Sequence, residues 1–345
     1  MNGARGRIVI TSAVAGAPDG WARSVLAELG LGPGDERSWR RLGPRMLVAW
    51  GDRLTDAALL RASQVQGIRR ALVMEDGERL VERWPIDTPS RGELVPGLRR
   101  GDQCTVIAGP CSVESAAHLL DVAGAVAEAG ADAIRAGLFK PRTSPYSFGG
   151  LGEAGLGALD RARERTGLPV VTEVLDRELL DIVAAHADLL QIGSRNMFNT
   201  ALLFEAGAHT SGKPVLLKRG FGATVDELLN AAEYVLLGRL AGGHDEPRLV
   251  LCERGIRSFE PSSRFTLDLA AVPVLRRRTH LPVIVDPSHA AGTRGLVIPL
   301  ALAAIGAGAE GLLLEVHPDP PRAWSDAAHA IGYDTFRQLM ERVRG

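Results

Sequence analysis

Eight short apolar runs recur at intervals of 20 to 38 residues between positions 104 and 317, and this repeat limits the fold more than any other feature. Each run has six to eight residues and is almost continuously apolar, as a strand covered on both faces is. Stretches with helical periodicity, Ser115–Ala129, Glu178–Ala185, Val225–Leu236 and Gly295–Ala307, lie between runs. The runs are Cys104–Cys111, Ala131–Gly137, Pro169–Val174, Leu189–Ser194, Pro214–Gly220, Arg248–Gly255, Pro282–His289 and Gly311–His317.

The alternation of strands and helices predicts an α/β fold with a parallel sheet. Eight strand–helix units in about 240 residues have the size expected of a (β/α)8 barrel, the TIM-barrel architecture. A doubly wound open sheet is the competing architecture, but it usually has fewer strands and gathers its polar residues at one switch point. Nearly every run in this chain ends in polar or charged residues, which favours the closed barrel.

The first hundred residues have a different order of elements. They follow the pattern β-α-β-β-α-β, with one strand that the sequence does not place, and this predicts a small ferredoxin-like α+β module. We assign residues 1–84 to the module, 85–103 to a linker and 104–345 to the barrel. The module has no cluster of chemically active residues, so we expect a structural or oligomerising appendage, or a regulatory module that senses a small molecule. The expected elements are the strands Arg7–Ala13, Arg45–Trp50 and Arg70–Glu75 and the helices Trp21–Leu29 and Asp56–Gln66.

The charges of the chain nearly cancel. Forty basic and 41 acidic residues give a net charge of −1, so the sequence lacks the electrostatic footprint of a nucleic-acid-binding or membrane-binding protein. Three cysteines are too few for a disulfide framework. No signal-peptide pattern is present, and the most apolar stretch, Leu296–Leu314, is broken by Pro299, Glu310 and several glycines. We therefore expect a soluble cytoplasmic protein.

Only three of the 40 basic residues are lysines, and two of them fall near strand ends. Lys140 follows the second run and Lys218 lies at the end of the fifth, whereas Lys213 follows Ser-Gly in a turn and is expected at the surface. Functional groups of a (β/α)8 barrel lie at the carboxyl ends of its strands. Because an ammonium and a guanidinium are not interchangeable, we expect Lys140 and Lys218 to have functions that arginine would not serve.

A thiol, an imidazole and a carboxylate lie at the ends of the first, seventh and eighth runs: Cys111, His289 and Glu315. These three strands become neighbours when the barrel closes. The mixture of donors suits a divalent transition metal of intermediate softness. Asp319 or Asp326, beyond the eighth strand, could complete the shell, and the spacing does not choose between them. The alternative is a buried structural cysteine beside a hydrogen-bonded histidine.

A second set of residues near the strand ends is cationic. Six basic side chains directed at one mouth would repel one another unless anions are bound, so they indicate one or two phosphate or carboxylate sites. The alternative is a salt-bridged rim in which some of them pair with Glu173, Glu253 or Asp286. The six are Arg135, Lys140, Arg142, Arg195, Lys218 and Arg254.

The strand-end segments also match a known family as literal strings. In order, from residue 104 to the C-terminus, they resemble the 3-deoxy-D-arabino-heptulosonate 7-phosphate (DAHP) synthases of class I, in the branch with a short ferredoxin-like N-terminal module. The whole series makes this resemblance specific, and no single string would. The strings are Ala108–Glu114 (AGPCSVE), Lys140–Phe148 (KPRTSPYSF), Gln191–Met197 (QIGSRNM), Pro214–Gly220 (PVLLKRG), Leu251–Arg257 (LCERGIR), Asp286–His289 (DPSH) and Glu315–Asp319 (EVHPD).

The resemblance implies a reaction. Members of this family condense phosphoenolpyruvate (PEP) with D-erythrose 4-phosphate and water to give DAHP and phosphate, the first step of the shikimate pathway of aromatic amino acid biosynthesis. A divalent metal is implied, with Mn²⁺ as the first choice and Fe²⁺, Co²⁺ or Zn²⁺ as alternatives. A homo-oligomer, either a dimer or a tetramer, is implied as well. By position, the implied metal ligands are Cys111, His289, Glu315 and Asp326, which selects Asp326 over Asp319.

The resemblance also implies how the two substrates are bound. Lys140, Lys218 and His289 would take part in catalysis, the two lysines by steering proton transfers. The second phosphate would lie near Arg142 and Thr143. PEP would be held by Arg135, Lys140, Arg195, Lys218 and Arg254.

Four positions depart from the family pattern. Gly149 and Phe198 replace usual glutamines, Phe265 replaces a usual asparagine, and Ala327 replaces a usual glycine. None of these changes removes an implied ligand or PEP contact. They leave open the identity of the acceptor and the subunit contacts.

Three alternatives to this function follow. A paralogue could use another aldose phosphate, as 3-deoxy-octulosonate 8-phosphate synthases do, although those enzymes carry an Ala-Asn-Arg-Ser type of loop where this chain has Lys140-Pro-Arg-Thr. A Schiff-base aldolase with Lys218 or Lys140 as the nucleophile would be independent of metal. A regulatory subunit that has kept the barrel would have no activity, and an intact set of ligands and cations argues against it.

Overall fold

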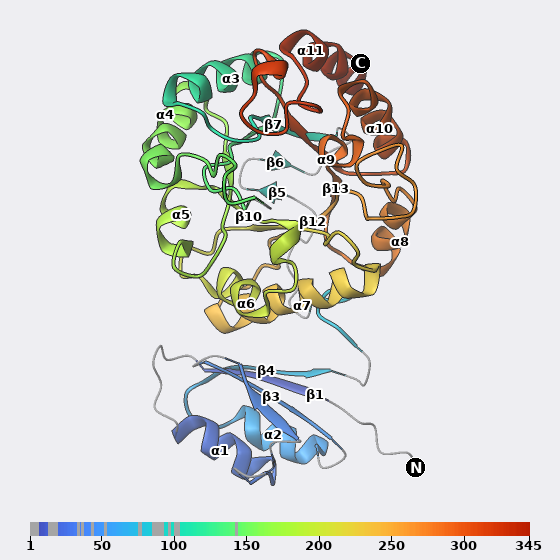
Figure 1. Ribbon diagram of the computed structural model, residues 1–345. Helices are drawn as coiled ribbons and strands as arrows, with labels where there is room; N and C mark the ends of the chain where they lie inside the picture. The colour runs from blue at the N-terminus through green and yellow to red at the C-terminus, as the bar shows by residue number, and fades with distance from the viewer. Residues whose placement is uncertain are drawn as a thin grey trace.

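The computed structural model describes residues 7–12, 20–32, 35, 38–42, 45–51, 54–74, 78–84, 93–95, 98–99, 104–141 and 144–345. Its larger part is a closed barrel of eight parallel strands in the order β7 to β14, with β14 pairing with β7 to close it (Figure 1). This confirms the predicted (β/α)8 architecture. The strands are β7 (Thr105–Gly109), β8 (Ala133–Arg135), β9 (Val170–Glu173), β10 (Leu189–Ile192), β11 (Val215–Lys218), β12 (Leu249–Glu253), β13 (Val283–Val285) and β14 (Gly311–Glu315).

Helices surround the barrel in Figure 1 and cover the outer face of its strands. Each strand lies inside one of the eight predicted runs, but the run that was predicted to extend to His289 ends as a helix. Asp286 caps that helix, its carboxylate accepting from the backbone N–H of His289, and Pro287 occupies the first helical turn, where its missing N–H costs nothing. The helices are α3 (Ala116–Glu128), α4 (Leu156–Thr166), α5 (Leu180–His186), α6 (Thr200–Ala208), α7 (Val225–Gly242), α8 (Ala271–Arg278), α9 (Pro287–Ala291), α10 (Arg294–Gly306) and α11 (Tyr333–Arg344).

The N-terminal module is a four-stranded antiparallel sheet in the order β2-β3-β1-β4 with two helices, which confirms the ferredoxin-like order. The strand that the sequence did not place is β2. A short hairpin, β5 (Glu93–Val95) with β6 (Leu98–Arg99), precedes the barrel. The module's elements are β1 (Arg7–Ser12), α1 (Gly20–Glu28), β2 (Trp39–Arg41), β3 (Met46–Trp50), α2 (Asp56–Ser63) and β4 (Ile68–Met74).

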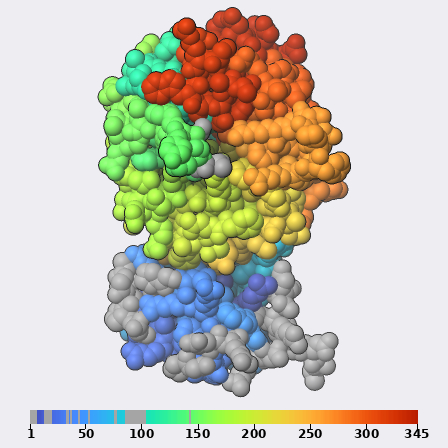
Figure 2. All heavy atoms as spheres, viewed as in Figure 1, coloured from blue at the N-terminus to red at the C-terminus, as the bar shows by residue number. Residues whose placement is uncertain are grey.

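Both faces of the module's sheet are covered, which explains why the middle of β1, Ile8–Ile10, is continuously apolar. Ile8 and Ile10 pack with α1 and α2, while Val9, on the opposite face, joins the core of the barrel domain. In Figure 2 the module forms a separate lobe beside the barrel. Polar contacts also join the two parts, because the buried carboxylate of Glu233 on α7 accepts from the backbone N–H groups of Leu80 and Val81.

Helices α6 and α7 approach each other through glycines. A Cβ atom on Gly207 would lie 2.1 Å from the carbonyl oxygen of Val235, and one on Gly238 would lie 2.1 Å from that of Phe204. Neither helix can accept a side chain at these positions without moving. Since α7 follows the strand that carries Lys218, this packing helps to fix one side of the barrel mouth.

Gly238→Ala is expected to lower the free energy of unfolding by about 1–3 kcal/mol, the usual cost of overpacking a close contact. The measurement is thermal or denaturant unfolding of both proteins. Gly157→Ala in α4 is the matched control, because the nearest atom to its new Cβ is the flexible end of Arg161, at 3.6 Å. The control should be slightly stabilised. Equal stability of Gly238→Ala and the original protein would contradict the close packing.

Within the described residues, no helix combines the length and the apolarity needed to cross a membrane.

Candidate active site

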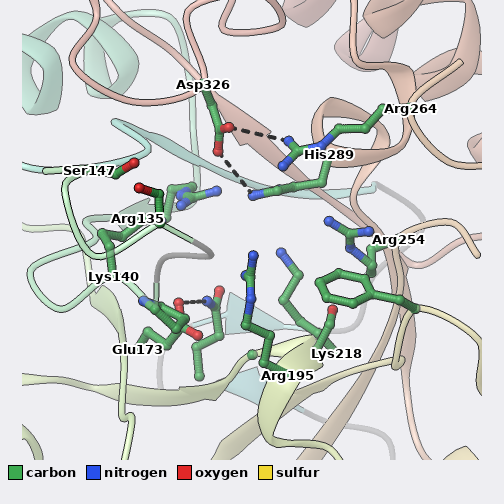
Figure 3. Close-up of a pocket in the computed structure, with 16 residues that line it drawn as sticks. Arg135, Lys140, Ser147, Glu173, Arg195, Lys218, Arg254, Arg264, His289 and Asp326 are labelled. Carbon is green, nitrogen blue, oxygen red and sulfur yellow. Dashed lines mark hydrogen bonds and ion pairs between the residues drawn. The ribbon is translucent and has the colours of Figure 1, made fainter. Parts of the chain in front are cut away.

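The carboxyl ends of the barrel strands enclose one cavity of about 230 Å³. Six basic side chains and two acidic ones, Glu173 and Asp326, line it, so the cavity carries a local excess of positive charge. Figure 3 shows side chains from several strands directed into the same space. A cavity of this size and charge suits small anions. Its basic residues are Arg135, Lys140, Arg195, Lys218, Arg254 and Arg264.

Two of these arginines, Arg135 and Arg254, have buried N–H groups that form no regular hydrogen bond with any described residue. Arg135 and Arg254 are each only 3% exposed. Among the described residues, none accepts a hydrogen bond of regular geometry from Nε or Nη1 of either side chain, although Nη1 of Arg135 lies 2.9 Å from Oε1 of Glu315. Burial also lowers the pKa of Arg254 below its ordinary value. A buried donor without an acceptor is costly, and an anionic ligand in the cavity would satisfy these groups.

Two stacked aromatic rings position Arg254. The rings of Phe221 and Phe265 lie 5.1 Å apart at 12°, and the guanidinium carbon of Arg254 lies 4.8 Å and 4.2 Å from their centroids. The guanidinium therefore makes cation–π contacts with both rings. Phe265 is one of the four departures from the family pattern, and the structure gives it this supporting function.

The predicted metal ligands come together beside the cavity. Cys111 Sγ lies 3.1 Å from Asp326 Oδ2. His289 Nε2 lies 3.4 Å from Glu315 Oε1 and 3.8 Å from Asp326 Oδ2. Four donors of this kind at these separations could share one divalent cation, since Zn–N, Zn–O and Zn–S bonds are about 2.0–2.3 Å long. Asp319 lies elsewhere, its backbone N–H donating to Nδ1 of His317.

A hydrogen bond fixes the tautomer of His289. Its Nδ1 lies 2.6 Å from Asp286 Oδ2, so the proton resides on Nδ1 and the lone pair of Nε2 faces Glu315 and Asp326. Carboxylate–histidine–metal triads have this arrangement. Asp286 also contacts Nζ of Lys218 and thereby links the metal-type cluster to the cationic set.

The charge states of the cluster fit a cation. Burial lowers the pKa of His289 to about 4, so the imidazole is neutral near pH 7. Burial alone would raise the pKa of Glu315, but His289, which is charged in the acidic range where a carboxyl titrates, and Arg135 hold it well below its usual range. Burial raises the pKa of the Cys111 thiol, so a bound metal would be needed to deprotonate it. Both carboxylate oxygens of Glu315 are buried, and among the described residues their close contacts, with Arg135 at 2.9 Å and His329 at 3.0 Å, lack regular hydrogen-bond geometry. The donor set and the unsatisfied carboxylate therefore fit a divalent metal.

Asp326 has an unusual backbone. Its φ is +53°, the one positive value of a non-glycine residue in the described part of the chain. Strain of this kind persists where the surrounding structure enforces it, often at functional sites. Arg264 Nη1 lies 3.2 Å from Asp326 Oδ1 and holds the side chain toward the cluster (Figure 3).

A second group of possible donors, Glu114, His118 and His317, has the wrong tautomers for a metal. The backbone N–H of Asp319 donates to Nδ1 of His317, at 3.0 Å, and that of Glu114 donates to Nδ1 of His118, at 3.4 Å. Each ring therefore carries its proton on Nε2, and the Nε2 of His317 lies 3.3 Å from Glu114 Oε1. We interpret these residues as a polar network rather than a metal site.

The structure places most of the predicted site residues together. Five of the predicted cations line the cavity, as do His289 and Asp326. Cys111 and Glu315 join them through the contacts given above. Arg142 and Thr143 lie outside the described residues. The salt-bridged alternative applies in part, because Lys218 pairs with Asp286, and Arg135 with Glu315.

Some residues of the site were missed by sequence reasoning. Gln191 lies within β10 rather than at its end, so the search of strand ends passed over it. Arg264 reaches the cavity from a long connection whose sequence has no periodic pattern. His329 contacts Glu315 and follows Asp326 by three residues, and this spacing was the available signal.

The fold and the site define a (β/α)8-barrel enzyme with an anion pocket beside a Cys/His/Glu/Asp cluster suited to a divalent metal. The model of the DAHP synthetase I family matches residues 94–344, and the chain belongs to this family.

Several known proteins are similar to this chain. A phospho-2-dehydro-3-deoxyheptonate aldolase of Thermotoga maritima is 48% identical over 240 residues, which are 70% of this chain and 69% of that protein. A 2-dehydro-3-deoxyphosphooctonate aldolase of Leptothrix cholodnii is 34% identical over 256 residues, 69% of this chain and 88% of that protein. The crystal structure of the Thermotoga maritima DAHP synthase superposes with a TM-score of 0.70 at 36% identity and covers 99% of this chain and 96% of that one.

Proposed function

We propose that this protein is a DAHP synthase, which joins PEP to D-erythrose 4-phosphate with addition of water and release of phosphate. The observation that carries this proposal is the cationic cavity beside the Cys111, His289, Glu315 and Asp326 cluster. The similarity to the Thermotoga maritima enzyme extends over both parts of the chain and supports the same reaction. The sequence identity to the Thermotoga maritima enzyme, 48%, is also higher than the identity to the octonate aldolase of Leptothrix cholodnii, which is 34%.

The cations of the cavity would bind PEP through its phosphate and carboxylate. Arg254 and Arg135 have buried donors that such oxygens would satisfy, and a bidentate contact would orient the molecule. Lys140 and Lys218 line the same cavity and would hold or pass a proton at the reacting carbons. By the resemblance to the family, the acceptor's phosphate would be bound by Arg142 and Thr143.

The acceptor aldehyde would lie next to the metal-type cluster. A divalent cation there supplies Lewis-acid polarisation of the aldehyde oxygen. The aldehyde carbon then accepts a bond from C3 of PEP, water adds at C2, and the C2–O bond to phosphate breaks, so that phosphate leaves with its bridging oxygen. His289 would serve as a ligand in this scheme, because its Nδ1 proton is committed to Asp286.

A Schiff-base aldolase is disfavoured by the environment of Lys218. Its Nζ forms an ion pair with the buried carboxylate of Asp286, and a nucleophilic amine at this position would have to give up that ion pair. Trapping with borohydride in the presence of substrate would identify such an enzyme.

The test is an assay of PEP consumption by the purified protein with erythrose 4-phosphate and Mn²⁺, with and without a chelator. We expect metal-dependent loss of PEP and formation of DAHP. Repeating the assay with pentose phosphates tests the acceptor, and no loss of PEP with any acceptor or metal would overturn the proposal.

The proposal has four further parts: Mn²⁺ as the native metal, a homo-oligomeric state, a regulatory function of residues 1–84 and a cytoplasmic location. Metal analysis, solution mass, effector titration and cell fractionation would test them.

Phe265→Ala is expected to weaken PEP binding about tenfold, because a desolvated cation–π contact contributes up to about 2 kcal/mol and Arg254 would lose one of its two aromatic contacts. The KM for PEP should rise more than the KM for the acceptor. Phe259→Ala is the control, since its ring is 98% exposed and lies on the same connection. An unchanged KM for PEP in the Phe265 variant would contradict the supporting function of this ring.

A further inference from the structure

His329 lies against the metal-type cluster but is not one of the four proposed ligands. Its side chain is only 3% exposed. Its Nε2 lies 3.0 Å from Glu315 Oε2 and 3.8 Å from Asp326 Oδ2. The ring is 5.6 Å from that of His289, so two imidazoles approach one buried carboxylate.

The two oxygens of Glu315 face different partners. Oε1 lies 3.4 Å from His289 Nε2 and 2.9 Å from Nη1 of Arg135. Oε2 is directed to His329. Oε1 is therefore the oxygen on the side of the donor set, and His329 engages the other one.

The backbone holds His329 in this place. The carbonyl oxygen of Asp326 accepts from the N–H groups of His329 and Ala330, at 3.1 and 3.2 Å, which closes a tight turn. The N–H of Ile331 then donates to the carbonyl oxygen of Glu315, at 3.0 Å. The segment that supplies Asp326 is thus anchored to the end of β14, with the imidazole beside the carboxylate.

The two histidines face the cluster in opposite tautomers. His289 gives its Nδ1 proton to Asp286 and directs a lone pair inward. At His329, a lone pair on Nε2 would repel the carboxylate oxygen 3.0 Å away, whereas an N–H would attract it, through a contact that is close but does not have regular hydrogen-bond geometry. Nη1 of Arg264, which can only donate, lies 3.5 Å from the same nitrogen and would favour a lone pair there, but this contact is longer than the one to Glu315.

We propose that His329 is a positioning residue of the metal centre: its Nε2–H holds Oε2 of Glu315, so that Oε1 alone is presented to the cation. A carboxylate fixed by one oxygen in this way binds as a monodentate ligand in one orientation. This inference rests on the metal site of the proposed function. It does not depend on which aldose phosphate is the acceptor.

The test measures metal binding without substrates. Co²⁺ is titrated into metal-free protein, and the dissociation constant and the visible absorption spectrum are recorded for the original chain, His329→Leu and His329→Gln. Because loss of a group that orients a ligand typically weakens metal binding 10–100-fold, we expect about a tenfold weaker dissociation constant for His329→Leu. His329→Gln, whose amide N–H can still donate to Oε2, should recover most of the affinity. The spectra of the loaded proteins should be the same, since the ligands are unchanged.

His317→Leu is the matched control. It removes another buried imidazole, one that belongs to the polar network with Glu114, and it should leave the Co²⁺ affinity unchanged. Original affinity in His329→Leu would overturn the inference. A spectrum that changes in both His329 variants, with no recovery in His329→Gln, would also overturn it by showing that His329 is itself a ligand. If the original chain binds no Co²⁺, the proposed metal site fails together with the inference. If it binds Co²⁺ and His329→Leu matches it, the inference fails alone.

Discussion

Cys111→Ala is expected to abolish metal-dependent turnover. The substitution removes the one sulfur donor of the cluster and leaves Asp326 without the partner 3.1 Å from its Oδ2. A Lewis-acid metal supplies several kcal/mol of transition-state stabilisation. At about 1.4 kcal/mol per tenfold change in rate, its loss corresponds to roughly a 10³-fold fall in kcat/KM. PEP consumption and the metal content of the purified variant are the two measurements, and both should fall together.

Cys104→Ala is the matched control for this experiment. Cys104 directly precedes β7, and Cys111 follows the other end of the same strand, so the two substitutions remove the same group from opposite ends of the barrel. The control should keep both its activity and its metal. Full activity of Cys111→Ala at saturating metal would remove Cys111 from the ligand set. Loss of activity with unchanged metal content would assign Cys111 to substrate binding instead.

The fold was predictable because barrel strands are buried on both faces. Continuous apolar runs with polar ends therefore marked all eight strands, and their number and spacing indicated a closed barrel. The strand β2 was missed because it has only three residues, Trp39–Arg41, of which two are arginines. Its pairing with β3 provides the stability that its own sequence does not indicate. The helical end of the seventh run was missed as well, since the caps that Asp286 and Pro287 provide act locally and apolar periodicity does not detect them.

The site was predictable as far as it lies at strand ends. Cys111, His289 and Glu315 were predicted in this way, and the resemblance to the family added Asp326 by its position. Contacts that depend on tertiary structure could not be found. The tautomer of His289 depends on a hydrogen bond within its own turn, and the position of His329 depends on a turn anchored to β14. The stacking of Phe265 on Phe221 joins two connections 44 positions apart, and no pattern in either one indicates it.

Lys218→Arg is expected to lower kcat/KM by about 100-fold, the scale of loss that follows a misplacement of about 1 Å at a reacting centre. The Lys218 side chain is 5% exposed, and its Nζ contacts Asp286, which in turn orients His289. A guanidinium keeps the charge but is larger and planar, so it would displace Asp286 or protrude into the space where PEP binds. The effect should appear in kcat and in the KM for PEP, with thermal stability changed little.

The third lysine provides the control for this experiment. Lys213 lies in a turn outside the cavity, where its Nζ is 3.7 Å from Asp188 Oδ1 and its side chain is 30% exposed. Lys213→Arg can keep this contact and should leave kcat and both KM values unchanged. A chain that uses arginine at 37 of its 40 basic positions would then need lysine in the cavity and not in the turn. If Lys218→Arg were as active as Lys213→Arg, the ammonium would have no special function, and the charge alone would account for Lys218.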